Sequence, residues 1–212
     1  MNAFAVLATT ASLVLTIADA PQAPASGRIA EPMIIDVRGD GFSLTTVQEG
    51  VRVDVDGDGQ PEQVAWTSAG SDDAFVCIDN NKDGVIQVPS ELLGGTTGPP
   101  VGFAYLAAMD GISSRRPEAV RDRHPDGVID KSDAIYGELI LWTDSNHNGR
   151  SEEDELESLE HAGIQQIASG YEGTPSVDAS GNRVRYRAQA RLTGKRGLDV
   201  AREVITVRLA RQ

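Results

Sequence analysis

The sequence contains one cysteine, Cys77, so the chain cannot form a disulfide within itself. Cys77 lies in the apolar segment 74–78, where a cysteine usually acts as a small buried hydrophobic side chain. A chain without disulfides needs another kind of cross-link outside the cell, and an ion that binds only the folded state can supply one.

Several arrangements typical of enzymes are also missing. The chain has three histidines, and no two of them have His-x-x-x-His spacing. No Ser, His and Asp order indicates a catalytic triad, and aromatic residues make up only 5% of the chain, which leaves few rings for stacking on sugars. A hydrolase acting on an anionic or polysaccharide substrate therefore remains only an alternative.

No apolar run is long enough to span a bilayer. The segment 4–18 has the length and small-residue content of a signal-peptide core, and small-x-small cleavage points occur at 18–20 and 23–25. No Lys or Arg precedes this run, so an N-terminal helix or strand is the alternative. We predict export, with residues 1–25 as leader and linker and a secreted, periplasmic or cell-surface location.

Positive charge is scarce in most of the chain. Residues 1–182 carry a net charge of −20, whereas residues 183–212 carry +7, within a total of −13. Many of the acids gather with glycines in turn-like clusters, where carboxylates repel one another unless a cation lies between them. The acidic body also argues against nucleic-acid partners.

The segment 144–155 follows the template of a calcium loop, with oxygen ligands at positions 1, 3, 5, 7, 9 and 12 and a glycine at position 6. The alternative is a solvated turn before an acidic helix. The predicted ligands are Asp144, Asn146, Asn148, the backbone carbonyl of Arg150, Glu152 and Glu155.

Three other segments repeat the spacing with departures from the template. The loop 54–62 lacks a closing acid at position 12, and the loop 79–91 has its acid one residue late. In the loop 122–133, His124 stands at position 3, and Asp110 could replace Asp122. The predicted ligands are Asp54, Asp56, Asp58, Gln60, Glu62; Asp79, Asn81, Asp83, the carbonyl of Val85, Glu91; and Asp122, Asp126, the carbonyl of Val128, Asp130, Asp133.

Two smaller predictions accompany these loops. Ile86 and Ile129 occupy position 8 of their loops, so we expect the two loops to pair back to back. The turn 36–41 carries Asp36 and Asp40 at positions 1 and 5 but Arg38 at position 3, and we interpret it as a structural turn.

The apolar spacing predicts a helix over 103–109, a second helix over 153–162 and a strand over 164–167. Residues 183–192 alternate between apolar and arginine side chains, and 205–209 continue the pattern, which indicates an antiparallel hairpin. Its arginine row faces either an anionic partner or solvent. We expect an α+β fold, with small antiparallel strands and short helices joined by EF-hand-like loops. We divide it into a calcium-loop domain over 26–175 and an Arg-rich hairpin over 176–212 that packs on it.

Taken in order, these motifs resemble a family of bacterial exported proteins with EF-hand-like loops. The matching segments include Gly-Asp-Gly-Phe at 39–42, Asp-x-Asp-Gly-Asp-Gly at 54–59, Gly-Ser-Asp-Asp-Ala-Phe at 70–75, Asp-Gly-Val-Ile-Asp at 126–130, Asn-His-Asn-Gly at 146–149 and Arg-Tyr-Arg-Ala at 185–188. Similar modules occur in large calcium-dependent surface proteins and repeat-containing toxins. The resemblance implies calcium binding and a secreted or surface location but supplies no activity. Separately, an adhesion or interaction module would have a protein or glycan partner at the cell surface. The alternative function is a calcium-stabilised extracellular hydrolase.

Overall fold

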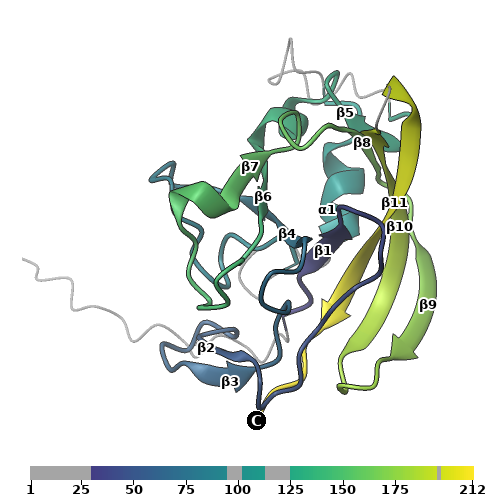
Figure 1. Cartoon of the computed structure of the whole chain (residues 1–212). Helices are drawn as coiled ribbons and strands as arrows, with labels where there is room; N and C mark the ends of the chain where they lie inside the picture. Colours follow the sequence, from purple (N-terminus) through teal and green to yellow (C-terminus); the bar gives the residue numbers. More distant parts are fainter. Residues whose placement is uncertain (1–29, 95–101, 113–124, 195–196) are drawn as a thin grey trace, which may run out of the picture.

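The computed structural model describes residues 30–94, 102–112, 125–194 and 197–212 (Figure 1). The leader predicted over 1–25 lies outside these residues, as do Asp122 and His124. The strands are β1 Met33–Asp36, β2 Val51–Val53, β3 Glu62–Val64, β4 Asp73–Ile78, β5 Val128–Asp130, β6 Leu139–Trp142, β7 Leu156–Ser158, β8 Ile164–Ala168, β9 Glu172–Val177, β10 Arg183–Thr193 and β11 Asp199–Arg208. The helices are α1 Gly102–Met109 and the 3-10 helices η2 Ala134–Glu138 and η3 Glu153–Glu155.

The fold is mostly β, which makes the predicted α+β class wrong. One large antiparallel sheet has the strand order β5-β8-β10-β11-β1-β4-β6-β7, with β9 also paired to β10. The strands β2 and β3 form a separate hairpin. The sheet curls so that α1 lies within its bend, between the long β10–β11 pair and β6 (Figure 1). Within the described residues, α1 is the single α-helix.

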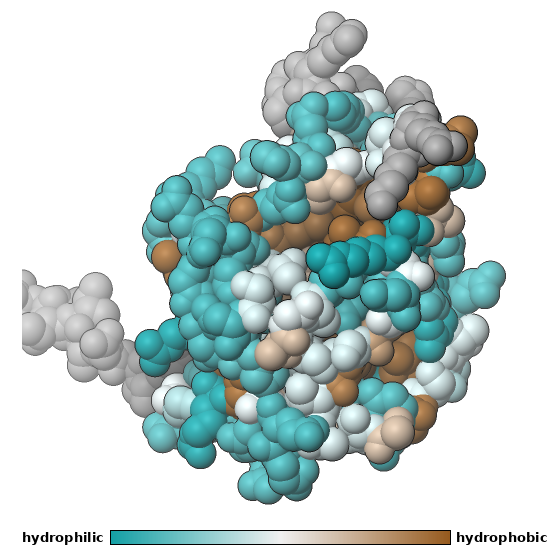
Figure 2. All heavy atoms as spheres, viewed as in Figure 1, coloured by the Kyte–Doolittle hydropathy of each residue, from teal (hydrophilic) through white to brown (hydrophobic). Residues whose placement is uncertain are grey.

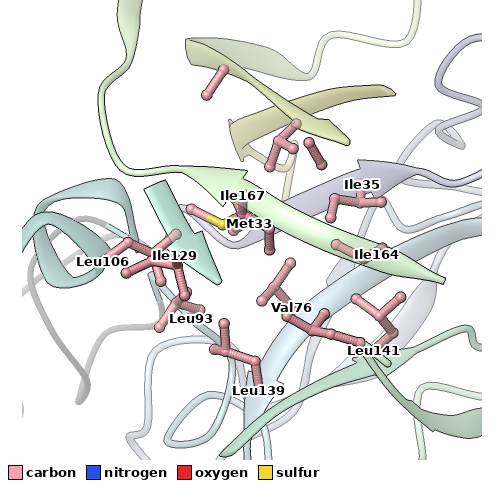
Figure 3. Packing of buried hydrophobic residues seen from close by; sticks show 14 of the residues in the cluster. Met33, Ile35, Val76, Leu93, Leu106, Ile129, Leu139, Leu141, Ile164 and Ile167 are labelled. Carbon is pink, nitrogen blue, oxygen red and sulfur yellow. The ribbon is translucent and has the colours of Figure 1, made fainter. Parts of the chain in front are cut away.

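The two central strands are buried on both faces, which explains why their sequences are almost continuously apolar. In β1, Met33 and Ile35 point into one core and Ile34 into the other. The same alternation sends Ala74 and Val76 of β4 to the first core. Figure 3 shows this first core, where side chains of β1, β4, β5, β6 and β8 meet Leu106 of α1. The second core lies under the β2–β3 hairpin.

Tryptophans and a phenylalanine form the centre of this second core. Trp66 lies 4.5 Å from Phe75 and 5.7 Å from Trp142, measured between ring centroids. All three side chains are fully buried, with Cys77 beside them as the small hydrophobic residue that its setting predicted. This aromatic cluster contacts the two ends of the loop 144–155, because Trp66 donates to Asp144 and Trp142 donates to Glu155.

The individual elements differ in how well the sequence predicted them. The helix over 103–109 is confirmed as α1, the strand over 164–167 as β8, and the hairpin as β10 and β11. The helix predicted over 153–162 is wrong, because the chain forms η3 and then pairs β7 with β6, placing Leu156 opposite Trp142. Pairing with β6 satisfies the backbone groups of residues 156–158 within the sheet, in place of a helix.

The C-terminal hairpin is part of the main sheet because β11 pairs directly with β1. Arg185 and Arg208 of this hairpin both contact Oε1 of Glu31, at 2.8 and 2.7 Å. Hydrophilic residues cover most of the face shown in Figure 2, with a hydrophobic recess in its upper part. No helix in the described segments has the length and apolar character needed to cross a membrane.

Candidate metal sites

Five turns share one hydrogen-bonding arrangement around a leading aspartate. In each, that carboxylate accepts hydrogen bonds from the backbone amides at positions 5 and 6 of the loop, and four of the five aspartates stand at or just after a strand end. The leading residues are Asp36, Asp54, Asp79, Asp110 and Asp144. The aspartate is thus fixed in orientation by the turn itself.

A second acid closes each turn from its other side. This carboxylate accepts the backbone amide at position 2 or position 3, at distances between 2.5 and 3.4 Å. The closing residues are Asp72, Glu62, Glu91, Asp133 and Glu155, in the order of the leading residues above. A carboxylate has about four lone-pair sites, so these amide contacts leave oxygens able to bind a cation between the two acids.

The loop 144–155 is tied directly to the aromatic cluster. The indole N–H of Trp66 donates to Oδ2 of Asp144 (2.8 Å), and that of Trp142 donates to Oε2 of Glu155 (3.2 Å). Both carboxylates are buried, with 1% and 6% of their surface exposed. The two ends of the predicted ligand set are therefore held by the core.

The middle of this loop is more exposed. The side-chain amides of Asn146 and Asn148 donate to Glu152 at 3.3 and 2.7 Å, and the side-chain oxygen of Asn148 accepts the amide of Arg150. The predicted ligands at positions 3, 5 and 9 are thus in mutual contact. Gly149 has φ +71°, and a side chain there would collide with Val53 of β2.

The loop 54–62 has the densest acidic cluster. Oxygens of Asp54, Asp56, Asp58 and Glu62 all lie within 4.8 Å of one another. Glu62 starts β3 and accepts the amide of Val55, so it supplies the closing acid that position 12 lacks. Asp56 also forms an ion pair with Arg211 at 3.0 Å. The backbone amide of Gln60, the predicted ligand at position 7, donates to Oδ1 of Asp58 at 2.7 Å.

In the loop 79–91, the carboxylate of Glu91 lies over the start of the turn. Glu91 is buried, and its two oxygens accept the amides of Asn80, Asn81 and Gln87. The amide of Val85, aided by side-chain donors, lowers the pKa of Asp83 and keeps that carboxyl ionised. A turn in which the amide of Glu91 donates to the carbonyl of Gln87 therefore brings this late acid back to the loop.

The predicted pairing of Ile86 with Ile129 is wrong. Ile86 donates its backbone amide to Oγ of Ser151, at 2.7 Å, and Ser151 occupies position 8 of the loop 144–155. Ile129 pairs with Ile167 of β8 and belongs to the other core. The loops 79–91 and 144–155 meet instead, because β4 and β6 are neighbours in the sheet.

At the loop ending in Asp133, Asp110 takes the leading position. It accepts the amides of Asp126 (3.1 Å) and Gly127 (3.0 Å), as well as the hydroxyl of Ser169 (2.7 Å). Burial raises the pKa of Asp133, while the amides of Asp130 and Gly111 act against that rise. Because Asp110 closes α1 on the far side of a long connection, its match to position 1 cannot be found by spacing within one loop.

Sequence reasoning missed Asp72 altogether. Its carboxylate lies within 4.8 Å of those of Asp36 and Asp40, although the turn 36–41 and the residue before β4 are far apart in the chain. The one available signal was the Gly-Ser-Asp-Asp motif at 70–73, which carried the family resemblance without being assigned to a metal.

The arginine row of β10 is partly neutralised. Arg185 contacts Glu31, and Arg187 contacts Glu203 of β11. An anionic partner would therefore meet less free positive charge on this strand than the sequence alone indicates.

Comparison with known proteins places this arrangement in a family. The iron-regulated protein FrpA of Neisseria meningitidis serogroup C is 28% identical over 170 residues, which cover 76% of this chain and 14% of FrpA. The chain thus corresponds to a small part of that relative's length. A family model described as the SPM domain matches residues 33–202, from β1 into β11. The chain therefore belongs to the SPM domain family.

Proposed function

We propose that the protein is a calcium-binding module of an exported bacterial protein, in which ions bound at the acidic turns stabilise the fold. The observation that carries this proposal is the group of four carboxylates at Asp54, Asp56, Asp58 and Glu62, whose oxygens lie within 4.8 Å of one another. Calcium takes six to eight oxygen ligands, whereas softer metals favour sulfur and imidazole, which this group lacks.

The turns support a coupling between ion binding and folding. Each brings a leading acid and a closing acid together, and repulsion between them disfavours the folded state when no ion is bound. A bound ion converts that repulsion into a link between two chain segments. At tenfold excess over the dissociation constant, each independent site contributes about 1.4 kcal/mol, so several sites together approach the stability of a small domain.

The proposed setting is outside the cell. Extracellular calcium modules bind with dissociation constants of about 0.1–1 mM, so such sites fill there and stay empty in the cytoplasm. The much greater length of FrpA supports the interpretation of this chain as one module of a longer protein. A protein or glycan at the cell surface is the partner class that we propose.

The test is a calorimetric calcium titration of the full chain, combined with melting curves in calcium and in chelator. We expect saturable binding of two or more ions and a large calcium-dependent rise in melting temperature. Asp54→Asn, Asp79→Asn and Asp144→Asn should each remove part of the binding. Asp144→Asn should also alter the calcium-dependent fluorescence change, because Trp66 donates to this carboxylate.

Glu153→Gln is the matched control, because this exposed acid lies in the same loop at a position that is not a predicted ligand. It should bind as the parent does. If the parent produces no binding heat and melts identically with and without calcium, the acidic turns do not bind calcium and the proposal is wrong.

The hydrolase alternative requires a pocket lined by two carboxylates that do not coordinate a metal ion. The open depression beside η2 contains Asp130 and Glu160, but Glu160 is paired with Lys131 at 2.6 Å and Asp130 accepts the amide of Ser132. This depression therefore gives no support to the hydrolase alternative, and calcium binding is the function that we propose.

A further inference from the structure

The long strand β10 pairs on one side with two shorter strands in succession, and a gap separates them. Strand β9 pairs with β10 over residues 183–187 and β8 pairs over residues 190–192, so Ala188 and Gln189 have no partner in either strand. At this gap the chain leaves the sheet over residues 169–171, between the end of β8 and the start of β9 (Figure 1).

Ser169 fixes the chain at the gap. Its amide donates to the carbonyl of Gly127 at 3.0 Å, and its hydroxyl donates to the carboxylate of Asp110 at 2.7 Å. A cavity of about 550 Å³ opens beside it. Sites for small molecules typically have volumes of about 300–1,000 Å³, so this cavity is large enough for a small organic ligand.

Tyr171 forms an aromatic wall of this cavity. Its ring stacks on Phe103 of α1, with 5.4 Å between centroids and 21° between planes, and Tyr186 meets its edge at 4.8 Å. Phe103 is fully buried, whereas 44% of the surface of Tyr171 is exposed. The core thus fixes the orientation of a ring that still has an open surface, so little conformational entropy is lost when a ligand packs on it.

Polar side chains from three strands line the rest of the cavity: Glu172, Arg187, Gln189 and Glu203. Arg187 forms an ion pair with Oε1 of Glu203 and donates to Oγ of Ser176 at 3.2 Å. A guanidinium has five N–H donors and a carboxylate has about four lone-pair sites, so these contacts leave both groups able to bind a ligand. The ion pair also holds the two side chains in place.

The charges around the cavity favour an uncharged, hydroxyl-rich ligand. The positive charge of Arg187 is paired with Glu203, and Glu172 adds a second carboxylate, so an anion would meet an excess of negative charge. A wholly apolar ligand would desolvate these groups without offering hydrogen bonds. Hydroxyls both donate and accept, and the C–H groups of a sugar ring pack on the negative face of an aromatic ring.

We propose that this cavity binds an uncharged saccharide, with one sugar ring packed on Tyr171 and its hydroxyls hydrogen-bonded to Arg187 and Glu203. This narrows the partner class of the proposed function to a glycan, and it rests on that function only for the cell-surface setting. The aromatic ring supplies an apolar contact, and the ion-paired side chains select among hydroxyl arrangements.

The test measures saccharide binding to the full chain in millimolar calcium by saturation-transfer NMR, followed by titration. The probes are the methyl glycosides of glucose, galactose, mannose and N-acetylglucosamine, with a methyl sialoside as the anionic probe and lysine methyl ester as the cationic one. We expect saturable binding of at least one neutral glycoside in the millimolar range. The proposal is overturned if no neutral glycoside binds, or if a charged probe binds more tightly than all of them.

Variants then locate the site. Tyr171→Ala should weaken binding about tenfold or more, because the stacking contact is lost, whereas Tyr171→Phe should bind as the parent does. Gln189→Trp is a second variant that leaves the Tyr171–Phe103 contact in place: it fills the cavity from an exposed position and should abolish binding without lowering the melting temperature. Arg191→Ala, on the same strand but outside the cavity lining, is the matched control and should bind normally.

Binding that survives both Tyr171→Ala and Gln189→Trp would place the sugar elsewhere and overturn the proposal. A calcium titration of the same samples separates it from the proposed function. If a neutral glycoside binds at the cavity and calcium does not bind, the saccharide site stands and the calcium-binding function fails. If calcium binds and no neutral glycoside does, the calcium-binding function stands and the saccharide site fails.

Discussion

At the scale of single residues, Asp73 is a buried carboxyl whose pKa lies well above its ordinary value. Burial raises its pKa to about 6; the amide of Ser43 acts against the rise, and the charges of Asp72, Asp36 and Asp40 add to it. In the unfolded chain the same group titrates near 3.8. Without metal, the folded state therefore holds a proton on Asp73 over a range of pH in which the unfolded chain has released it.

The sign of the effect on stability follows from this difference in proton binding. The stabilisation from the protonated carboxyl is complete below about pH 4 and is lost as the pH rises through about 6. We expect the metal-free parent to lose about 2–3 kcal/mol of unfolding free energy over this window relative to Asp73→Asn. Urea unfolding of both proteins at several pH values measures this. A constant difference between them from pH 4 to 7 would contradict it.

At the scale of elements, substitution of the glycine at position 6 of a loop measures how closely that loop packs on its neighbours. Gly149 and Gly84 both have positive φ, at +71° and +80°. A Cβ on Gly149 would lie 2.7 Å from Cγ1 of Val53, whereas a Cβ on Gly84 would meet nothing within 4 Å.

Gly84→Ala should therefore cost only the backbone strain of about 1–2 kcal/mol. Gly149→Ala should cost this strain plus about 1–3 kcal/mol for overpacking against β2. Denaturant unfolding in calcium compares the two variants, and Gly84→Ala serves as the matched control. Equal losses would show that β2 can move away from the loop 144–155 at little cost.

Elements also show how far the sequence could be read. The alternation of apolar and arginine side chains over 183–192 predicted β10, because successive side chains of a strand point to opposite faces and one face is buried. The segment 156–158 could not be predicted in this way, since its strand conformation depends on pairing with β6 across the intervening loop. Spacing identified the acids that gather within one turn but missed Asp72, which the β1–β4 pairing brings to Asp36.

At the scale of the whole molecule, the excess of negative charge over residues 1–182 predicts two separable effects of ions. Monovalent salt screens repulsion between the acidic turns, because the Debye length falls from about 10 Å at 0.1 M to about 3 Å at 1 M. We expect 1 M sodium chloride to raise the melting temperature of the chelated protein, but by less than millimolar calcium does. Magnesium at the same concentration as calcium should have the smaller effect, since it demands a tighter octahedral geometry.

Differential scanning calorimetry under these conditions separates screening from binding. Some of the arginines in residues 183–212 form ion pairs with Glu31, Glu203 and Asp56, so salt will also weaken those ion pairs. If sodium chloride alone reproduces the full effect of calcium, the turns act as a diffuse negative charge and not as ion sites.

The pairing of β11 with β1 has a consequence for the order of folding. Met33 lies opposite Thr206, so the strand at the centre of the sheet receives one of its two neighbours only after almost the entire chain has been synthesised. Contacts between such distant residues slow folding, because a long loop must close before they form. A nascent chain that ends before residue 199 would thus expose one edge of β1, and the sheet can close only once β11 has been synthesised.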